Sequence, residues 1–414
     1  MKRINSLVKI GITFIALFII INIIIFSFVA LTYSIPKLSG SDSAQTAIET
    51  ILSDGVYKNE CDGWTDLLIF NSVYISAKHG ESPYMMALSN PVSLSSDPIS
   101  QSAELLNNSG QYMYYTNYFV GITGALKVML GFMSYQTFCE AQYMIFMFSF
   151  VGACICLYYF AGGWKATLAL LVTATLGNFF RFIPCITYSV DVVISLMAMI
   201  AVCCLYFKKK FSLVPYFFFS IGILTYLMNY WSFPIYSLGL PLTLCILLSI
   251  RNGEQNPLSI FLSTLKRALC WIFGFGTEVI FRLISARVLH GSSEGLEHLT
   301  WYTQKGSMFD NGSRFDVLQR MVNKFWTPHK LVLLLIAVLI MIIFSRKEIR
   351  KIIINKEAGM MLRFILSFIL IALIPFVWLF ALYNHAFHGF DNYLLSMSAF
   401  PILSIFLMSR DRRL

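Results

Sequence analysis

Long apolar runs divide this sequence, and they constrain its fold more than any other feature. A run of about 20 apolar residues is the length that an α-helix needs to cross the hydrocarbon core of a bilayer. Hydrophobic residues make up 57% of the 414 residues and charged residues only 13%, whereas water-soluble domains carry about 25% charged residues. The pattern excludes a water-soluble enzyme, a disordered chain, a secreted disulfide scaffold and a β-barrel, whose strands would alternate apolar with polar residues.

Eleven apolar segments can be distinguished, and they predict an all-α polytopic transmembrane bundle of about ten crossings. They lie at residues 10–33, 113–133, 137–160, 164–182, 184–207, 212–228, 231–250, 268–287, 329–345, 362–383 and 393–409. The first of them follows Met1-Lys2-Arg3, and its apolar core is longer than that of a signal peptide. We therefore expect an uncleaved first helix over residues 1–33.

The charged residues predict which side of the membrane each connection faces. Eighteen of the 31 Lys and Arg, but only 4 of the 21 acids, lie in the connections 1–9, 208–210, 251–267, 346–363 and 410–414. Lys and Arg in short loops mark the cytoplasmic side. The connections 34–112, 288–328 and 384–392 hold 14 acids and 7 basic residues and are expected to face outward. The net charge of +10 is thus a topology signal that requires no nucleic acid partner, and both termini are predicted to be cytoplasmic.

Two cytoplasmic termini require an even number of crossings, so one apolar segment does not cross fully. The charges of the flanking loops place this segment between residues 113 and 207. We expect segment 164–182 to be the short or re-entrant one, because Lys165 begins it and Gly177, Asn178 and Arg181 end it. Segment 113–133, which contains Asn117 and Lys127, is the alternative.

The connection 34–112 is the largest polar region and is expected to form a small folded unit with short helices. Ser41-Asp42 predicts a helix to about Thr50, and the stretch from Asp62 predicts a second one to about Lys78. Residues 89–112 are rich in Ser, Asn and Pro and predict irregular loop. The remaining organisation is a bundle over 113–287, a second outside loop over 288–328, and C-terminal spans over 329–414 interrupted by the short loop 384–392.

Asp62 and Asp66 are the first candidate catalytic residues, because carboxylates four residues apart share one face of a helix. Such a pair could activate an acceptor hydroxyl as general base, or hold a divalent metal against a phosphate. The structural alternative is that Asp62 caps the helix and that Asp66 is a first-turn residue favoured by the helix dipole.

His385, His388 and Asp391 lie within the outside loop of nine residues and suit a phosphate site, a proton relay or a metal. Interfacial histidines without a function are the alternative. Charges inside spans are costly and mark functional sites by default, which singles out Asp191, Glu278 and Arg282. Glu278 and Arg282 lie four residues apart, so they are also expected to neutralise each other on one helix.

Three stretches give the chain a resemblance to a known class of membrane enzymes. Tyr112-Met113-Tyr114-Tyr115-Thr116-Asn117-Tyr118-Phe119-Val120-Gly121 resembles a Y-x-R-Y-W-H-G-Y stretch. The segment from Gly222 through Asn229 and Pro234 to Pro241 is similar to a G-x-L-T-x-x-x-D-x-x-x-x-P…G-x-P stretch, and Asn384-His385 with His388 looks like N-H-S-x-x-H. These stretches, and the long acidic loop after the first helix, resemble the GT-C class of integral membrane glycosyltransferases, in particular a group of bacterial multi-span proteins with that layout. The chain departs from the pattern at Asn117, Val120 and Asn229, where the group has Arg, His and Asp.

The resemblance implies a transferase that moves a sugar from a polyprenyl-phosphate donor to a glycan or lipid acceptor at the outer face of the bacterial cytoplasmic membrane. Asp62 or Asp66 would be the catalytic acid residue, with a divalent metal as the only cofactor to consider. The lipid phosphate would be held by His385, His388, Lys305 and Arg314. Asn117, Asn229, Asp191 and Arg282 are expected to line the cavity.

Two other functions are compatible with the same residues. A transporter or lipid flippase would place Asp191, Glu278 and Arg282 on its path, although we find no internal repeat of the kind that transporters show. A non-catalytic partner in envelope assembly would explain the three departures from the family pattern.

Overall fold

The computed structural model describes residues 2–34, 41–55, 63–78, 90–93, 97–107, 112–115, 121–228, 233–254, 256–291, 313–354, 358–382 and 391–407, with a few single positions between 293 and 300. Helices dominate it, and seven of the described helices are long and apolar enough to cross a membrane. These are Val8–Ser34, Tyr135–Gly162, Ile186–Phe207, Phe211–Met228, Pro257–Leu289, Pro328–Lys347 and Phe364–Ala381. The prediction of a helical membrane protein is therefore confirmed at this level.

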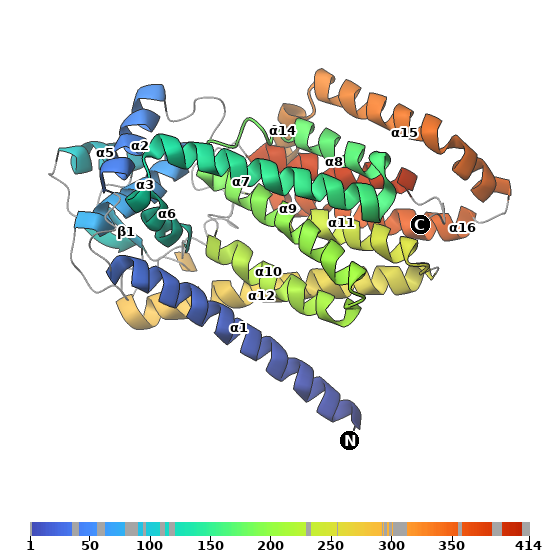
Figure 1. Ribbon diagram of the computed structural model, residues 1–414, viewed down its shortest axis with the longest axis horizontal. Coiled ribbons are helices and arrows are strands. Elements are labelled where there is room, and N and C mark those ends of the chain that lie inside the picture. Colours follow the sequence, from blue (N-terminus) through green and yellow to red (C-terminus); the bar gives the residue numbers. More distant parts are fainter. Residues whose placement is uncertain are drawn as a thin grey trace.

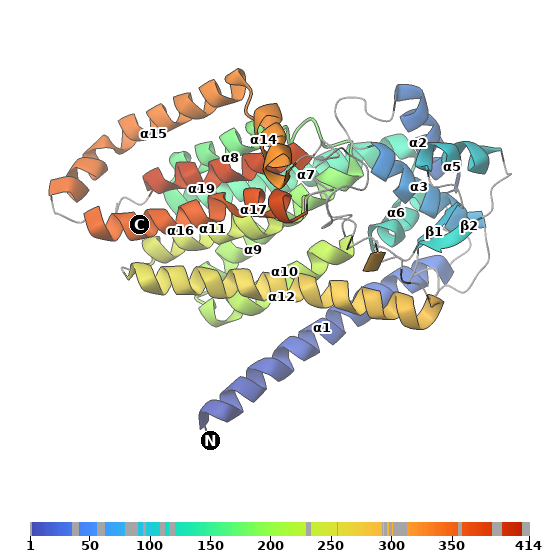
Figure 2. The ribbon, with the colours of Figure 1, turned by 180° about the vertical axis from the view of Figure 1, so that it is seen from behind.

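The chain forms two parts, and the first helix, α1 (Lys2–Ser34), leads into the first of them. At one end lies a group of short elements that we call the end unit (Figures 1 and 2). It consists of α2 (Ser41–Asp54), α3 (Gly63–Lys78), β1 (Asn90–Ser93), α5 (Pro98–Leu106), β2 (Tyr112–Tyr115) and α6 (Gly121–Phe132). The start of α1 lies at the opposite end, which we call the far end (Figure 1).

The bundle packs beside the end unit and contains the rest of the helices (Figure 1). They are α7 (Tyr135–Cys156) with the π-helical η2 (Leu157–Gly162), α8 (Trp164–Leu176), α9 (Ile186–Phe207), η3 (Phe211–Leu213) with α10 (Val214–Met228), α11 (Tyr236–Arg251), α12 (Pro257–His290), α14 (Arg314–Phe325), α15 (Pro328–Ile354), α16 (Ala358–Ala372), α17 (Ile374–Ala381), η4 (Asp391–Ser398), α19 (Ala399–Ser404) and η5 (Ile405–Leu407).

The end unit is more ordered in its secondary structure than the sequence predicted. Helices α2 and α3 match the two expected helices, but residues 89–112 are not irregular throughout. They contain α5 and the two antiparallel strands β1 and β2, which pair Pro91 with Tyr114. Asp97 caps α5 and Pro98 occupies its first turn, a combination typical of helix starts.

Polar contacts between its helices hold the end unit together. The Asn71 amide of α3 donates to the Pro98 carbonyl at 3.3 Å and accepts from the Ser102 hydroxyl at 3.0 Å. The Ser43 hydroxyl of α2 donates to the Met133 carbonyl just before α7, at 3.1 Å. The unit is thus tied both to itself and to the bundle.

Helices α6 and α8 correspond to the two segments, 113–133 and 164–182, one of which is expected not to cross the membrane. Helix α6 has 12 residues and lies in the end unit, whereas α8 has 13 residues and lies among the bundle helices (Figure 1). Both helices are shorter than the seven described helices that are long enough to cross a membrane. The turn between η2 and α8 reverses the chain at Gly163, whose φ of +63° suits glycine.

The chain turns at the far end are the basic ones. Lys208, Lys209 and Lys210 connect α9 to α10, and Arg251 ends α11 before the next turn. The Lys165 ammonium at the start of α8 donates to the Phe344 carbonyl at 2.9 Å, and the Ser345 hydroxyl donates to the Phe406 carbonyl at 3.0 Å. The last described residues therefore lie at the far end, as does the start of α1.

Candidate functional site

The candidate site is the end of the bundle that the end unit covers, and Asp66 is its best-defined residue. Asp66 is 4% exposed. One carboxylate oxygen accepts from the Ile186 backbone N–H at 3.0 Å. The other accepts from the Thr187 backbone N–H at 3.0 Å and from the Thr187 hydroxyl at 2.6 Å. Asp66 thus joins α3 to the first turn of α9.

This contact has a clear physical reason. The first N–H groups of a helix have no partner within the helix, and the helix dipole favours a negative charge beside them. The N-cap residue of α9, Cys185, supplies no side-chain acceptor. Asp66 supplies this acceptor from another helix, α3. The Asp66 carboxylate therefore has a structural role, and both of its oxygens accept hydrogen bonds.

Asp62, the second carboxylate of the expected pair, lies outside the described residues. Trp64, two residues further along the chain, lies in the first turn of α3, and its side chain is hydrogen-bonded to the Asp97 carboxylate. Partial burial opposes ionisation of Asp97, but hydrogen bonds from the Ser100 backbone N–H and hydroxyl outweigh it and hold the Asp97 pKa below its usual value. The start of α3 is therefore fixed to the start of α5.

Of the four predicted phosphate-binding residues, only Arg314 can be placed. It begins α14, directly after Ser313, which forms a capping box with Asp316. The Arg314 guanidinium lies 5.8 Å from the centre of the Phe380 ring in α17. Lys305, His385 and His388 lie outside the described residues.

Lys330 is a further cation at this end, and the sequence analysis did not single it out. Its ammonium lies 4.1 Å from the ring centre of Phe325 and 4.4 Å from that of Tyr393. It thereby brings together α14, α15 and η4. The sequence offered one signal for this site. Lys330 lies just inside the apolar segment 329–345 and follows the aromatic residue Phe325 by five positions.

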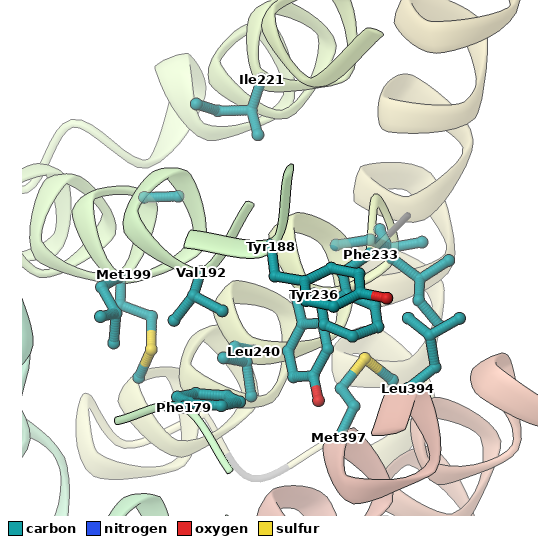
Figure 3. Close-up of a cluster of buried hydrophobic side chains, with 14 of the residues drawn as sticks. Phe179, Tyr188, Val192, Met199, Ile221, Phe233, Tyr236, Leu240, Leu394 and Met397 are labelled. Carbon is teal, nitrogen blue, oxygen red and sulfur yellow. The ribbon is translucent and has the colours of Figure 1, made fainter. Parts of the chain in front are cut away.

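Asp191 lies deeper, on α9, and is 1% exposed. Its carboxylate accepts from the Phe233 backbone N–H at 2.7 Å, and the Phe233 ring stacks on Tyr188 with ring centres 4.4 Å apart. Figure 3 shows Tyr188, Phe233 and Tyr236 gathered in one cluster. Asp191 therefore holds the chain where it enters α11. Asn229 and Asn117, the other expected cavity residues, lie outside the described residues.

Glu278 and Arg282 lie on α12 and are both buried. The Glu278 carboxylate accepts a hydrogen bond from the Asn22 amide of α1, and the Asn22 amide also donates to the Phe18 carbonyl at 3.0 Å. The Tyr226 side chain of α10 interacts electrostatically with both Glu278 and Arg282. The hydrogen-bond partner of Glu278 is Asn22, so Glu278 anchors α1 to α12, while Tyr226 of α10 lies close enough to interact with both charged residues.

Two features thus stand out: the end unit is anchored to α9 by Asp66, and two cations, Arg314 and Lys330, lie over aromatic rings of α14, α17 and η4. Within the described ranges, no group of three or more His, Cys, Asp or Glu side chains is arranged to hold a metal ion. The expected metal between Asp62 and Asp66 involves a residue outside those ranges. In comparisons with known proteins, no protein family, no curated protein and no solved structure matches this chain.

Proposed function

We propose that the protein is an integral membrane glycosyltransferase of the GT-C type, which transfers a sugar from a polyprenyl-phosphate donor to an envelope acceptor. The observation that carries this proposal is the Asp66 contact with the first turn of α9. It fixes an end unit, inserted directly after the first helix, onto one end of a membrane bundle. Helix α3, which directly follows Asp62 in the sequence, is thereby held beside the bundle.

The proposed topology has ten crossings. These are α1, α7 with η2, α8, α9, α10, α11, α12, α15, α16 with α17, and the segment from η4 to η5. Helix α6 is the apolar segment that does not cross, because it belongs to the end unit. The basic turns at the far end assign that end to the cytoplasm. The end unit then faces outward from the bacterial cytoplasmic membrane.

In the proposed reaction Asp62 is the general base. Its carboxylate takes the proton of the acceptor hydroxyl while the hydroxyl oxygen attacks the anomeric carbon. The bond from that carbon to the phosphate oxygen breaks, and the polyprenyl phosphate leaves with the bonding electron pair. Cations are needed to stabilise the leaving phosphate, and His385, His388, Lys305, Arg314 and Lys330 are assigned to this role. A divalent metal beside Asp62 is the alternative source of positive charge.

Asp62→Asn and Asp66→Asn distinguish catalysis from architecture. In cells that depend on this gene, we expect Asp62→Asn to abolish the surface glycan and leave the melting temperature of the purified protein unchanged. Asp66→Asn should lower the melting temperature, because one oxygen acceptor facing the α9 N–H groups is replaced by an amide donor. Normal glycan in the Asp62→Asn strain would refute the assignment of Asp62.

A transporter or lipid flippase is the second candidate, and the burial of Glu278, Arg282 and Asp191 inside the bundle favours it. The same strains separate the two functions when uptake of labelled substrate is measured beside glycan composition. Loss of uptake in a Glu278→Gln strain with unchanged glycan would favour transport over transfer. A protein in which none of these substitutions changes glycan or uptake would instead be a non-catalytic assembly partner.

A further inference from the structure

A buried arginine at the far end has no role in the proposed transfer reaction. Arg267 lies about three turns into α12 and is only 8% exposed. Its guanidinium lies 5.9 Å from the ring centre of Tyr206 on α9. The Tyr206 hydroxyl bonds with the Ser249 hydroxyl at 2.9 Å and donates to the Cys245 carbonyl of α11 at 3.3 Å. The guanidinium therefore lies where α9, α11 and α12 meet.

One nitrogen of the buried Arg267 guanidinium lacks an acceptor. Among the described residues, neither its Nη1 nor the Thr264 hydroxyl oxygen has a hydrogen-bond partner, and both atoms are buried. Thr264 is 7% exposed and precedes Arg267 by three residues, so the two side chains share one face of α12. By contrast, Arg287 at the other end of the same helix donates to the Gly291 carbonyl at 2.8 Å.

We propose that Arg267 and Thr264 form a binding site for a phosphate oxyanion between α9, α11 and α12. A buried guanidinium that leaves a donor without an acceptor is costly, and an anionic ligand removes this cost. A guanidinium and a hydroxyl donate to phosphate oxygens with favourable geometry. The phosphate belongs to an anionic lipid headgroup of the adjacent leaflet or to free phosphate.

The charges around the site favour an anion. Arg251 ends α11, and Lys208, Lys209 and Lys210 follow α9, so the far ends of both neighbouring helices carry exposed positive charge. Such a cluster raises the local concentration of anions and their rate of arrival. The site is at the opposite end of the bundle from the proposed transfer reaction and does not depend on it.

Lys266 provides a matched control because it precedes Arg267 directly and carries the same charge. It is exposed and lines an apolar groove of about 340 Å³ between α1 and α12, with Phe14, Leu262, Leu265, Leu269, Cys270 and Phe273. Lys266 and Arg267 therefore point to different sides of α12. A substitution of Lys266 removes one charge from the same turn without touching the proposed site.

The test uses the full-length protein in phosphatidylcholine nanodiscs and measures binding of added phosphatidylglycerol or of inorganic phosphate. We expect Arg267→Gln to weaken binding at least tenfold and Thr264→Val to weaken it about threefold, while Lys266→Gln changes it less than twofold. Binding of phosphatidylglycerol alone identifies a lipid headgroup site, and binding of inorganic phosphate with the same losses identifies a free phosphate site.

Three results would overturn the proposal. These are the absence of binding of either probe to the wild-type protein, equal binding by the wild-type and Arg267→Gln proteins, or an equal loss in Lys266→Gln. Thr264→Val keeps the buried charge and removes only one hydroxyl. It therefore still tests the site if Arg267→Gln does not fold.

Discussion

Lys127 shows how a single buried charge makes the end unit sensitive to pH. It lies on α6 and is 2% exposed, with its ammonium 3.4 Å from the Ser76 carbonyl oxygen and 4.7 Å from the ring centre of Tyr33. Burial lowers the Lys127 pKa to about 8. The unfolded chain, in which a lysine pKa is about 10.4, therefore binds more protons than the folded chain between these two values.

The free energy of unfolding should therefore rise with pH between about 8 and about 10.4, and Lys127 should contribute no slope below about pH 8. At about 1.4 kcal/mol for each pKa unit, the full rise is on the order of 3 kcal/mol. Lys127→Met should remove this part of the pH dependence. The check is to record melting temperatures of both proteins from about pH 7 to about pH 11, a range that brackets the two pKa values. A constant difference between the two curves would contradict the pKa shift.

Asp66 shows what sequence reasoning can and cannot supply for one residue. The prediction of a helix at about 62–78 is confirmed by α3, and Asp66 was expected to be either catalytic or a first-turn residue favoured by the dipole of that same helix. The sequence could not show that the donor groups belong to Ile186 and Thr187, about 120 residues away along the chain. Such a contact depends on tertiary packing, which no local pattern encodes.

Among the elements, the crossing of α10 and α12 depends on two glycines. A Cβ at Gly222 would lie 2.2 Å from the Trp271 carbonyl oxygen, and one at Gly274 would lie 2.1 Å from that of Phe219. The backbones of the two helices therefore touch, as small residues permit in membranes. Gly276, on the same helix as Gly274, has no atom within 4 Å of such a Cβ.

Gly222→Ala should destabilise the protein by about 1–3 kcal/mol, because backbone atoms cannot move aside as a side chain could. Gly276→Ala should be neutral or slightly stabilising, since alanine favours a helix. Unfolding in mixed micelles with increasing sodium dodecyl sulfate measures both. Equal effects of the two substitutions would mean that the close approach does not determine stability.

Apolar length predicts that a helix exists better than it predicts where the helix begins. Most spans follow from apolar length alone, which is why α1, α7, α9 and α10 were predicted. Helix α12 begins at Pro257, about three turns before the predicted start of its span at residue 268. Polar residues among 257–267 made this stretch resemble a connection, although it continues the same helix. Arg267 was accordingly counted as a loop charge, and its burial was not foreseen.

For the whole molecule, the proposed topology makes a prediction about labelling. A membrane-impermeant maleimide should label Ser53→Cys in intact cells, since α2 is assigned to the outside. All three variants are made in a protein without its native cysteines. Lys210→Cys and Trp164→Cys should react with the maleimide only after the cells are permeabilised. Trp164 is the first residue of α8, directly after the turn that follows η2, and this turn faces inward only if α8 crosses. Labelling of Trp164→Cys in intact cells would show that α8 is re-entrant and that α6 crosses.

Helix α9 has a mechanical consequence that follows from its two attachments. It has 22 residues and is about 33 Å long. Asp66 holds its first turn to the end unit, and Tyr206 in its last turn is held by α11 and covered by Arg267. A continuous α-helix resists compression along its axis because each turn rests on hydrogen bonds to the next. Helix α9 can therefore transmit force along its axis, so that a shift at its far end would move the end unit by the same distance.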